Sequence, residues 1–214
     1  MIPGRPVTVK CPSCSMLQLR RTLLSGNTLG ARYYSDGKCD APMLPEYPYY
    51  VKCPVCEAFF KIKESLCRKS SSDDNSEMPF VSFLSVDELC AAIEKGLYNG
   101  NKKDVLPLRI LLWRGFNDRV RDGGSNLFRE KDSGEDDKAI YEDNCRAILS
   151  LLAKNKEDEN LLVQAEVFRN LGEFDKCKKL LEKIKSPDKF IVYISSISKA
   201  CGAKSTVTVC VENE

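Results

Sequence analysis

The pattern of apolar and polar positions changes character about a third of the way along the chain. Before residue 69, apolar and polar residues alternate in short runs, as in Leu17-Gln18-Leu19-Arg20, which predicts strands. After residue 78, apolar residues recur at the three- and four-residue spacing of amphipathic helices. The polar stretch between them has no periodicity and predicts a linker over residues 69–78. The pattern therefore predicts an α+β fold, with a small β-rich domain over residues 1–68 and an α-helical domain over residues 79–203.

Local signals mark several elements within this outline. Asp36-Gly37 follows an apolar run and favours a β-hairpin. Ser85 and Glu88 have the spacing of a capping box, which predicts the start of the first helix. Further helices are expected over about residues 104–121 and 137–154, then on both sides of Leu171-Gly172, and last after Ser186-Pro187. The tail, residues 204–214, alternates at period two and is expected to be strand-like, with no partner strand assigned to it.

Two cysteine pairs carry the clearest chemistry in the chain. Cys11 with Cys14 and Cys53 with Cys56 form two C-x-x-C turns, each preceded by Val-Lys. Two such turns supply four thiolates, which is the ligand set of a closed tetrahedral zinc site. The pairs are predicted to bind one Zn²⁺ per chain, in a structural site without an open coordination position.

The spacing and arrangement of these pairs over about residues 7–63 resemble the zinc-ribbon class. The resemblance implies that Cys11, Cys14, Cys53 and Cys56 are the metal ligands. Such turns often have glycine after the second cysteine, where this chain has Ser15 and Glu57. The pattern also resembles rubredoxin, whose four thiolates hold iron, so iron is the alternative metal. A third interpretation is redox chemistry at the two Cys-Pro-x-Cys motifs, of the kind seen in thioredoxin-like enzymes.

Composition limits the classes of function. The chain has 11 cysteines and no histidine, which excludes Ser-His-Asp and Cys-His nucleophile pairs and imidazole general bases. The N-terminal residues do not form a secretory signal, and no apolar run is long enough to span a membrane. We therefore expect a cytoplasmic protein that does not associate with membranes and in which several of the other cysteines lie on apolar helix faces.

Charge is unevenly divided, since residues 1–68 have a net charge of +5 and the remainder −3. Aromatic and basic residues are interleaved in the first part and could contact bases and phosphates of a nucleic acid, or a protein partner. The alternative is that a small domain needs its aromatic residues for its core. The residues of this candidate surface are Arg20, Arg32, Tyr33, Tyr34, Lys52, Phe60 and Lys61.

The helical part contains one segment that resembles a tetratricopeptide repeat, over residues 161–184. The matching positions are Leu161, Ala165, Phe168, Cys177, Leu181 and Ile184, and no second copy precedes them. The resemblance implies a groove for a protein partner, and the alternative is ordinary helix packing.

A second candidate contact surface lies earlier in the helical part. One face of the helix predicted over residues 104–121 carries Arg114, Asp118 and Arg121, and Asn117 lies beside them. This face could bind an anion or a partner, or form a solvated row of ion pairs.

These observations together predict a non-catalytic, zinc-binding adaptor whose helical domain contacts a protein. The chain as a whole resembles bacterial zinc-ribbon proteins of unknown function. Nucleic-acid binding through the basic and aromatic residues of the ribbon is the alternative, and thiol redox activity is the third.

Overall fold

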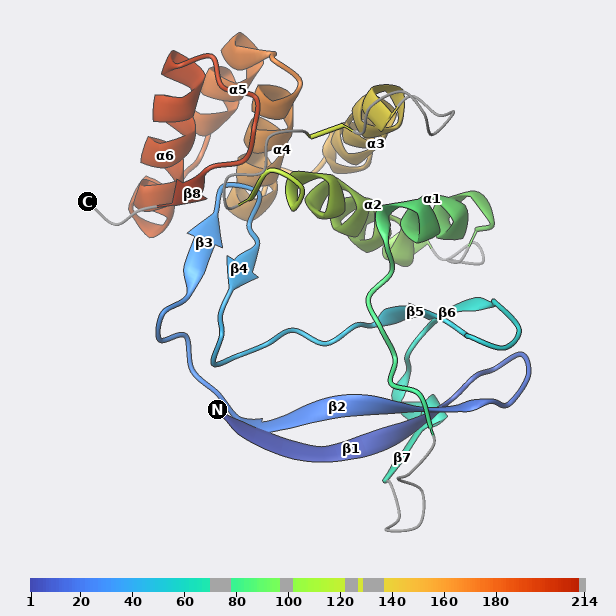
Figure 1. The fold of residues 1–214 in the computed structure, drawn as a ribbon. Helices are drawn as coiled ribbons and strands as arrows, with labels where there is room; N and C mark the ends of the chain where they lie inside the picture. The colour runs from blue at the N-terminus through green and yellow to red at the C-terminus, as the bar shows by residue number, and fades with distance from the viewer. Residues whose placement is uncertain (70–77, 97–101, 122–126, 129–136, 212–214) are drawn as a thin grey trace. The chain divides into compact units, whose positions relative to one another are not determined.

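The structure is a computed structural model, and it has the predicted α+β composition. It describes residues 1–69, 78–96, 102–121, 127–128 and 137–211. Most of the predicted linker, residues 69–78, lies outside these ranges. Figure 1 shows the described strands and helices as labelled below.

Contacts within the chain divide it into two compact units. The strand-rich unit combines Met1–Ala31 with Asp40–Gly100, and the helical unit combines Arg32–Cys39 with Asn101–Glu214. This division differs from the predicted boundary between residues 68 and 79. The first helix belongs with the strands, and the Asp36-Gly37 hairpin belongs with the helices, because their contacts join residues that are distant in sequence.

The strand-rich unit is built on two antiparallel ribbons, each closed by one of the cysteine turns. Its strands are β1 (Ile2–Lys10), β2 (Leu17–Ser25), β5 (Tyr50–Lys52), β6 (Phe59–Lys61) and β7 (Cys67–Lys69), with a 3₁₀ turn η1 (Glu64–Leu66) and one helix, α1 (Val86–Glu94). The sheets have the orders β2-β1-β7 and β5-β6. The pairs Lys10 with Leu17 and Lys52 with Phe59 end the two ladders beside the cysteines.

A small apolar core connects these ribbons. It contains alternate residues of the strands together with one cysteine from each turn, namely Val9, Cys11, Val51, Cys53, Phe60 and Ile62. Helix α1 begins as predicted, since the Ser85 hydroxyl accepts from the Glu88 amide at 3.2 Å and the Glu88 carboxylate accepts from the Ser85 amide at 3.0 Å. These two bonds satisfy amide donors that would otherwise have no partner in the first turn.

The helical unit consists of five helices and a small sheet among its described residues. The helices are α2 (Lys102–Asn117), α3 (Asp137–Leu152), α4 (Asp158–Asn170), α5 (Phe174–Leu181) and α6 (Ile191–Gly202), with a 3₁₀ turn η5 (Pro187–Phe190). The sheet has the order β4-β3-β8, from β3 (Arg32–Tyr34), β4 (Cys39–Asp40) and β8 (Cys210–Val211). Strand β4 spans the division between the two units.

The apolar face of α3 is buried, since Tyr141, Cys145, Ile148 and Leu152 recur at helical spacing and are all at most 3% exposed. On α6, Ile197 is 0% exposed, but Ile191 at the start of the helix is 55% exposed. The matching positions of the repeat-like segment also pack together, with Leu161, Ala165, Cys177, Leu181 and Ile184 in one core cluster and Phe168 packed against it. Figure 1 shows α4, α5 and α6 side by side.

The last helix starts differently from the prediction. Ser186 makes no side-chain capping bond, and residues Pro187–Phe190 form the 3₁₀ turn before α6. The tail, for which no partner strand was predicted, pairs antiparallel with the hairpin, where Tyr33 faces Val211 and Tyr34 faces Cys210.

Candidate metal centre

The two cysteine turns have the same local geometry. In the first, the Cys11 amide donates to Met16 O at 2.8 Å and the Ser15 amide donates to Cys11 O at 3.0 Å. In the second, the equivalent bonds of Cys53 to Ala58 and of Glu57 to Cys53 are both 2.9 Å long. Each turn thus returns the chain tightly enough to direct two sulfurs to one side.

Both turns require a left-handed residue after the second cysteine. Ser15 has φ of 64° and Glu57 has φ of 56°, so these side-chain-bearing residues adopt the conformation for which glycine is usually selected. The absence of glycine at these positions therefore does not change the geometry of the turns.

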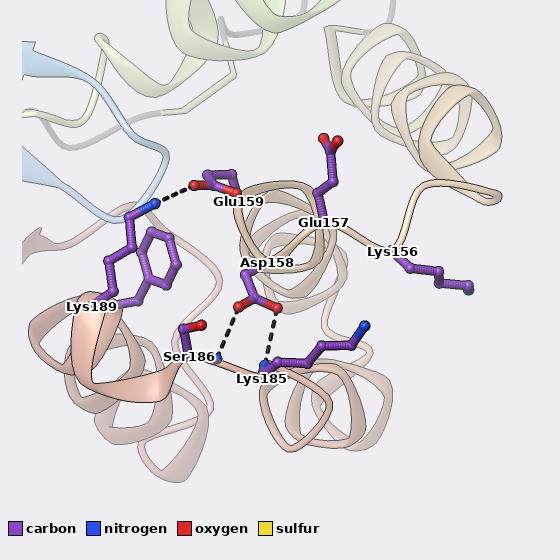
Figure 2. A pocket seen from close by; sticks show the side chains of 8 residues that line it. Lys156, Glu157, Asp158, Glu159, Lys185, Ser186 and Lys189 are labelled. Carbon is purple, nitrogen blue, oxygen red and sulfur yellow. Dashed lines mark hydrogen bonds and ion pairs between the residues drawn. The ribbon is translucent and has the colours of Figure 1, made fainter.

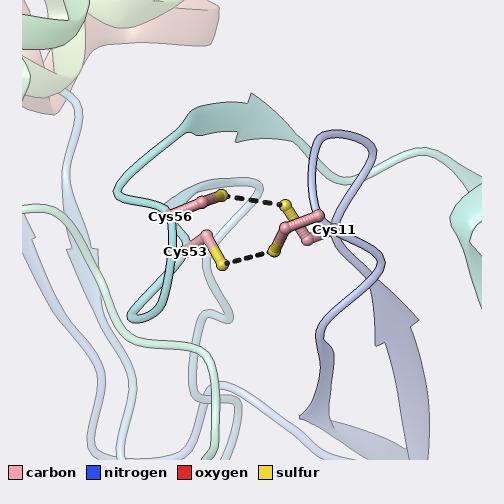
Figure 3. A group of neighbouring side chains, drawn as sticks. Cys11, Cys53 and Cys56 are labelled. Carbon is pink, nitrogen blue, oxygen red and sulfur yellow. Dashed lines mark hydrogen bonds between the residues drawn. The ribbon is translucent and has the colours of Figure 1, made fainter.

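The four sulfurs of the two turns converge. Cys11 Sγ lies 3.7 Å from Cys56 Sγ, and Cys14 Sγ lies 3.6 Å from Cys53 Sγ. All four ligand atoms lie within 4.8 Å of one another. Figure 3 shows Cys53 and Cys56 facing the turn that carries Cys11.

These distances fit a single metal ion. Zn–S bonds of about 2.3 Å in a tetrahedron place neighbouring sulfurs ~3.8 Å apart, close to the separations of 3.7 and 3.6 Å between the two turns. All four cysteines are free thiols rather than disulfide partners. Cys11 and Cys53 are buried, whereas Cys14 and Cys56 are exposed, so the cluster lies at the edge of the apolar core.

The ionisation of the cluster also favours a cation. Burial raises the pKa of Cys53, but backbone amides of Cys56 and Val55 and the neighbouring thiols lower it to about 7. At Cys56 the Ala58 amide lowers the pKa, and the neighbouring cysteines together raise it to about 12. One thiolate therefore disfavours the next, and a bound divalent cation would remove this repulsion because its ligands must be deprotonated.

The seven residues of the predicted nucleic-acid or partner surface are divided between the two units. Arg20, Lys52, Phe60 and Lys61 are in the strand-rich unit, whereas Arg32, Tyr33 and Tyr34 are in the helical unit. Phe60 is 5% exposed and Tyr34 is 4% exposed, so both are core residues. Their rings are part of the apolar core. The sequence pattern could not distinguish such buried aromatic residues from an exposed surface on which bases stack.

Several basic side chains of that predicted surface contact aromatic rings or a carboxylate in their own unit. Arg20 lies over the Tyr49 ring at 4.8 Å, and Lys61 lies over the Tyr50 ring at 5.6 Å. Lys52 pairs with Glu57 at 2.7 Å, next to the second cysteine turn. The Lys52 side chain thus contacts the left-handed residue of that turn, whose side chain remains 72% exposed.

The candidate surface of Arg114, Asn117 and Arg121 binds a group of the same chain. Helix α2 ends at Asn117 rather than at residue 121 as predicted, so Arg121 lies after the helix and not on its face. Arg114 Nε donates to Asp36 O at 3.2 Å, Asn117 Nδ2 donates to Asp36 Oδ2 at 2.9 Å, and Arg121 contacts both Asp36 carboxylate oxygens. Asp36 and Asn117 are each 1% exposed. Burial opposes ionisation of Asp36, but Arg121 and Asn117 outweigh it and lower the pKa of this carboxyl below its usual value. These residues therefore join the hairpin to α2 instead of forming a solvated row.

A larger buried polar network continues from this contact, and the sequence pattern did not reveal it. Trp113 Nε1 donates to Asn170 Oδ1 at 2.9 Å, and Glu166 and Arg169, both 0% exposed, form an ion pair on α4. Charged residues three positions apart on a helix are usually solvated, so their spacing carried no signal of burial. Gln164, also on α4, is 6% exposed but donates to the carbonyls of Asn155 and Asn160 and is not joined to this network.

A depression of about 550 Å³ lies between the start of α4 and the turn from α5 to η5. Figure 2 shows the Asp158 carboxylate facing the backbone nitrogens of Lys185 and Ser186, which donate to it at 3.0 and 2.9 Å. Glu159 pairs with Lys189 at 2.6 Å. These groups bind one another and hold the turn against α4, so we assign no ligand to the depression.

Comparisons with known proteins do not assign the chain to a family. No protein-family model matches it, and neither the search of curated proteins nor that of solved structures gave a match. Among the described residues, none of the helices combines the length and apolar character needed to cross a membrane.

Proposed function

We propose that the chain is a non-catalytic zinc-binding adaptor, in which a zinc ribbon stabilises the strand-rich unit and the helical unit contacts a protein partner. The observation that supports it is the pair of matched cysteine turns with four sulfurs within 4.8 Å. A closed set of four thiolates is typical of a structural zinc site, which contributes folding energy rather than catalysis. The helical role is supported by the repeat-like packing of α4 against α5.

The metal is tested on the purified full chain by elemental analysis of zinc, iron and sulfur. We expect about one zinc per chain, and its loss in Cys53→Ser. Cys210→Ser, which changes an exposed thiol outside the cluster, is the matched control and should retain the metal. Iron with the visible absorption of a ferric tetrathiolate would change the metal assignment. A chain that binds neither metal, and whose cysteines cycle with a dithiol reductant, would favour the redox interpretation.

The adaptor role is tested by affinity capture from native extract, with one half of the sample treated with nuclease. A defined protein that survives nuclease and moderate salt would support the proposal. Co-purified material that disappears with nuclease, and whose binding falls steeply as salt rises, would support nucleic-acid binding instead. In that case Arg20→Glu and Lys61→Glu in the strand-rich unit should weaken binding.

A further inference from the structure

The tip of the β3–β4 hairpin presents a carboxylate to the helical unit. Asp36 occupies the Asp-Gly turn, where Gly37 has φ of +75° and the Lys38 amide donates to Asp36 Oδ1 at 3.1 Å. The turn therefore fixes the direction of the side chain before it meets the helices. Its carboxylate is completely buried in the ion pair with Arg121.

The donors around this carboxylate are arranged as in a binding site. Arg121 Nη2 donates to Oδ2 at 2.5 Å and Nη1 donates to Oδ1 at 3.2 Å, which is the two-point geometry that arginine offers a carboxylate. The Arg121 guanidinium also lies 4.3 Å from the centre of the Tyr34 ring, on the adjacent strand. Arginine thus contacts the hairpin through both the charge and the ring.

The amide donor is itself held in position. Asn117 Oδ1 accepts from the Tyr141 hydroxyl at 3.2 Å, so its Nδ2 is directed toward Asp36. Tyr141 in turn accepts from Trp113 Nε1 at 3.2 Å, in a chain of buried groups from α2 and α3. A donor oriented in advance by a second set of hydrogen bonds is characteristic of a site that recognises one chemical group.

The C-terminal tail closes the adjoining side of the hairpin. The Ser35 amide donates to Val209 O at 2.9 Å, and the Val209 amide donates to Ser35 Oγ at 3.0 Å. Ser35 Oγ also donates to Glu166 Oε1 at 2.6 Å. The Ser35-Asp36 turn is therefore enclosed by α2, α4 and the tail.

We propose that the helical unit contains a recognition site for an acidic residue, in which Arg121 and Asn117 bind the carboxylate and Arg114 binds the main-chain carbonyl, and that Asp36 is its ligand, supplied by the same chain. The site recognises an acidic residue in a tight turn, by two-point contact with arginine and an oriented amide. Occupation by Asp36 attaches residues 32–39 to the helices and keeps these donors from any external acidic partner.

The test replaces the ligand and then supplies its charged group from solution. Asp36→Ala removes the carboxylate and leaves space for a formate ion beside Arg121. Urea unfolding of the purified chain of 214 residues is followed by the fluorescence of Trp113, the single tryptophan, which is 0% exposed. We expect a lower midpoint for Asp36→Ala, and a higher midpoint when sodium formate replaces sodium chloride at equal ionic strength.

Matched variants show whether recognition or packing is responsible. Wild type and Asp188→Ala, which changes an exposed aspartate of the same unit, should show no rise with formate. A rescue that disappears in Asp36→Ala/Arg121→Gln would support the site. The proposal is overturned if Asp36→Ala is as stable as Asp188→Ala, or if formate has no greater effect on it than on the controls.

Should Asp36→Ala fail to fold, Asp36→Gly provides a second cavity that acetate fits. Recovery of the folded signal on refolding in acetate, but not in chloride, supports the site. Equal failure in both salts overturns it.

Discussion

Arg169 is the residue whose loss should cost the helical unit most among the charged side chains we describe. It is 0% exposed, and its guanidinium donates to Glu166 Oε2 at 2.8 Å and to Glu166 Oε1. It also donates to two carbonyls of the tail, Ser205 O at 2.5 Å and Val207 O at 2.8 Å. Arg169→Met keeps much of the apolar stem but removes every one of these bonds.

The expected loss of stability follows from the groups that Arg169→Met leaves without their partner. Glu166 would remain as a buried carboxylate that retains the Ser35 hydroxyl at 2.6 Å and the weak Asn170 contact at 3.4 Å. Breaking a buried ion pair by removing one partner typically costs about 3–5 kcal/mol. With a urea dependence of ~2 kcal/mol per molar, this lowers the midpoint by about 2 M. The carbonyls of Ser205 and Val207 lose their donor as well, which lowers the stability further.

The assay is urea unfolding at neutral pH, followed by Trp113 fluorescence, which reports on the helical unit alone. Lys176→Met is the matched control, because Lys176 and Glu173 are also three residues apart but the lysine side chain is 64% exposed. This control should change stability by less than about 1 kcal/mol. The double variant Glu166→Gln/Arg169→Met removes both charges and should be more stable than Arg169→Met.

Two outcomes would refute this reasoning. If Arg169→Met lowers the midpoint no more than Lys176→Met, the buried pair is not what stabilises α4 and the tail. If the double variant is less stable than Arg169→Met, the stranded carboxylate is not the cause of the loss.

Three further predictions concern other parts of the chain. Cys53→Ser should increase hydrogen exchange throughout the strand-rich unit and leave the Trp113 transition unchanged, because zinc binding of about 10–16 kcal/mol acts on that unit; a shifted transition would contradict this. Since the pKa of Asp36 is lower in the folded state, its stabilisation is present above about pH 4 and is lost on acidification, so wild type should lose stability more steeply than Asp36→Asn between about pH 5 and pH 3; parallel pH profiles in urea titrations would exclude this linkage. Ser85→Ala removes the N-cap of α1 and should weaken this helix by about 1 kcal/mol, seen as faster amide exchange in residues 86–89 compared with Ser195→Ala on α6; equal exchange in the two variants would argue against the cap.

The sequence by itself determined the features that depend on neighbouring residues. The capping box of Ser85 and Glu88 joins groups three residues apart, and the Asp36-Gly37 turn satisfies its own backbone. The C-x-x-C spacing likewise determines that two sulfurs lie on one side of each turn. The apolar faces of the helices could be read because periodicity and burial have the same cause.

Only the tertiary structure decided which segments belong together. Residues 32–39 precede the second cysteine turn in sequence, yet their contacts are with α2, α4 and the tail. The bonds that join Ser35 and Asp36 to the rest of the helical unit link residues 78 to 174 positions apart, as for Arg114 with Asp36 and Val209 with Ser35. The buried charges follow the same rule. In the sequence, Glu166 and Arg169 have the spacing of a solvated ion pair, and only the folded chain brings Ser35 and the tail carbonyls into contact with them. Local chemistry specifies turns and helices, whereas the burial of a charge depends on partners that only the folded chain brings within hydrogen-bond distance.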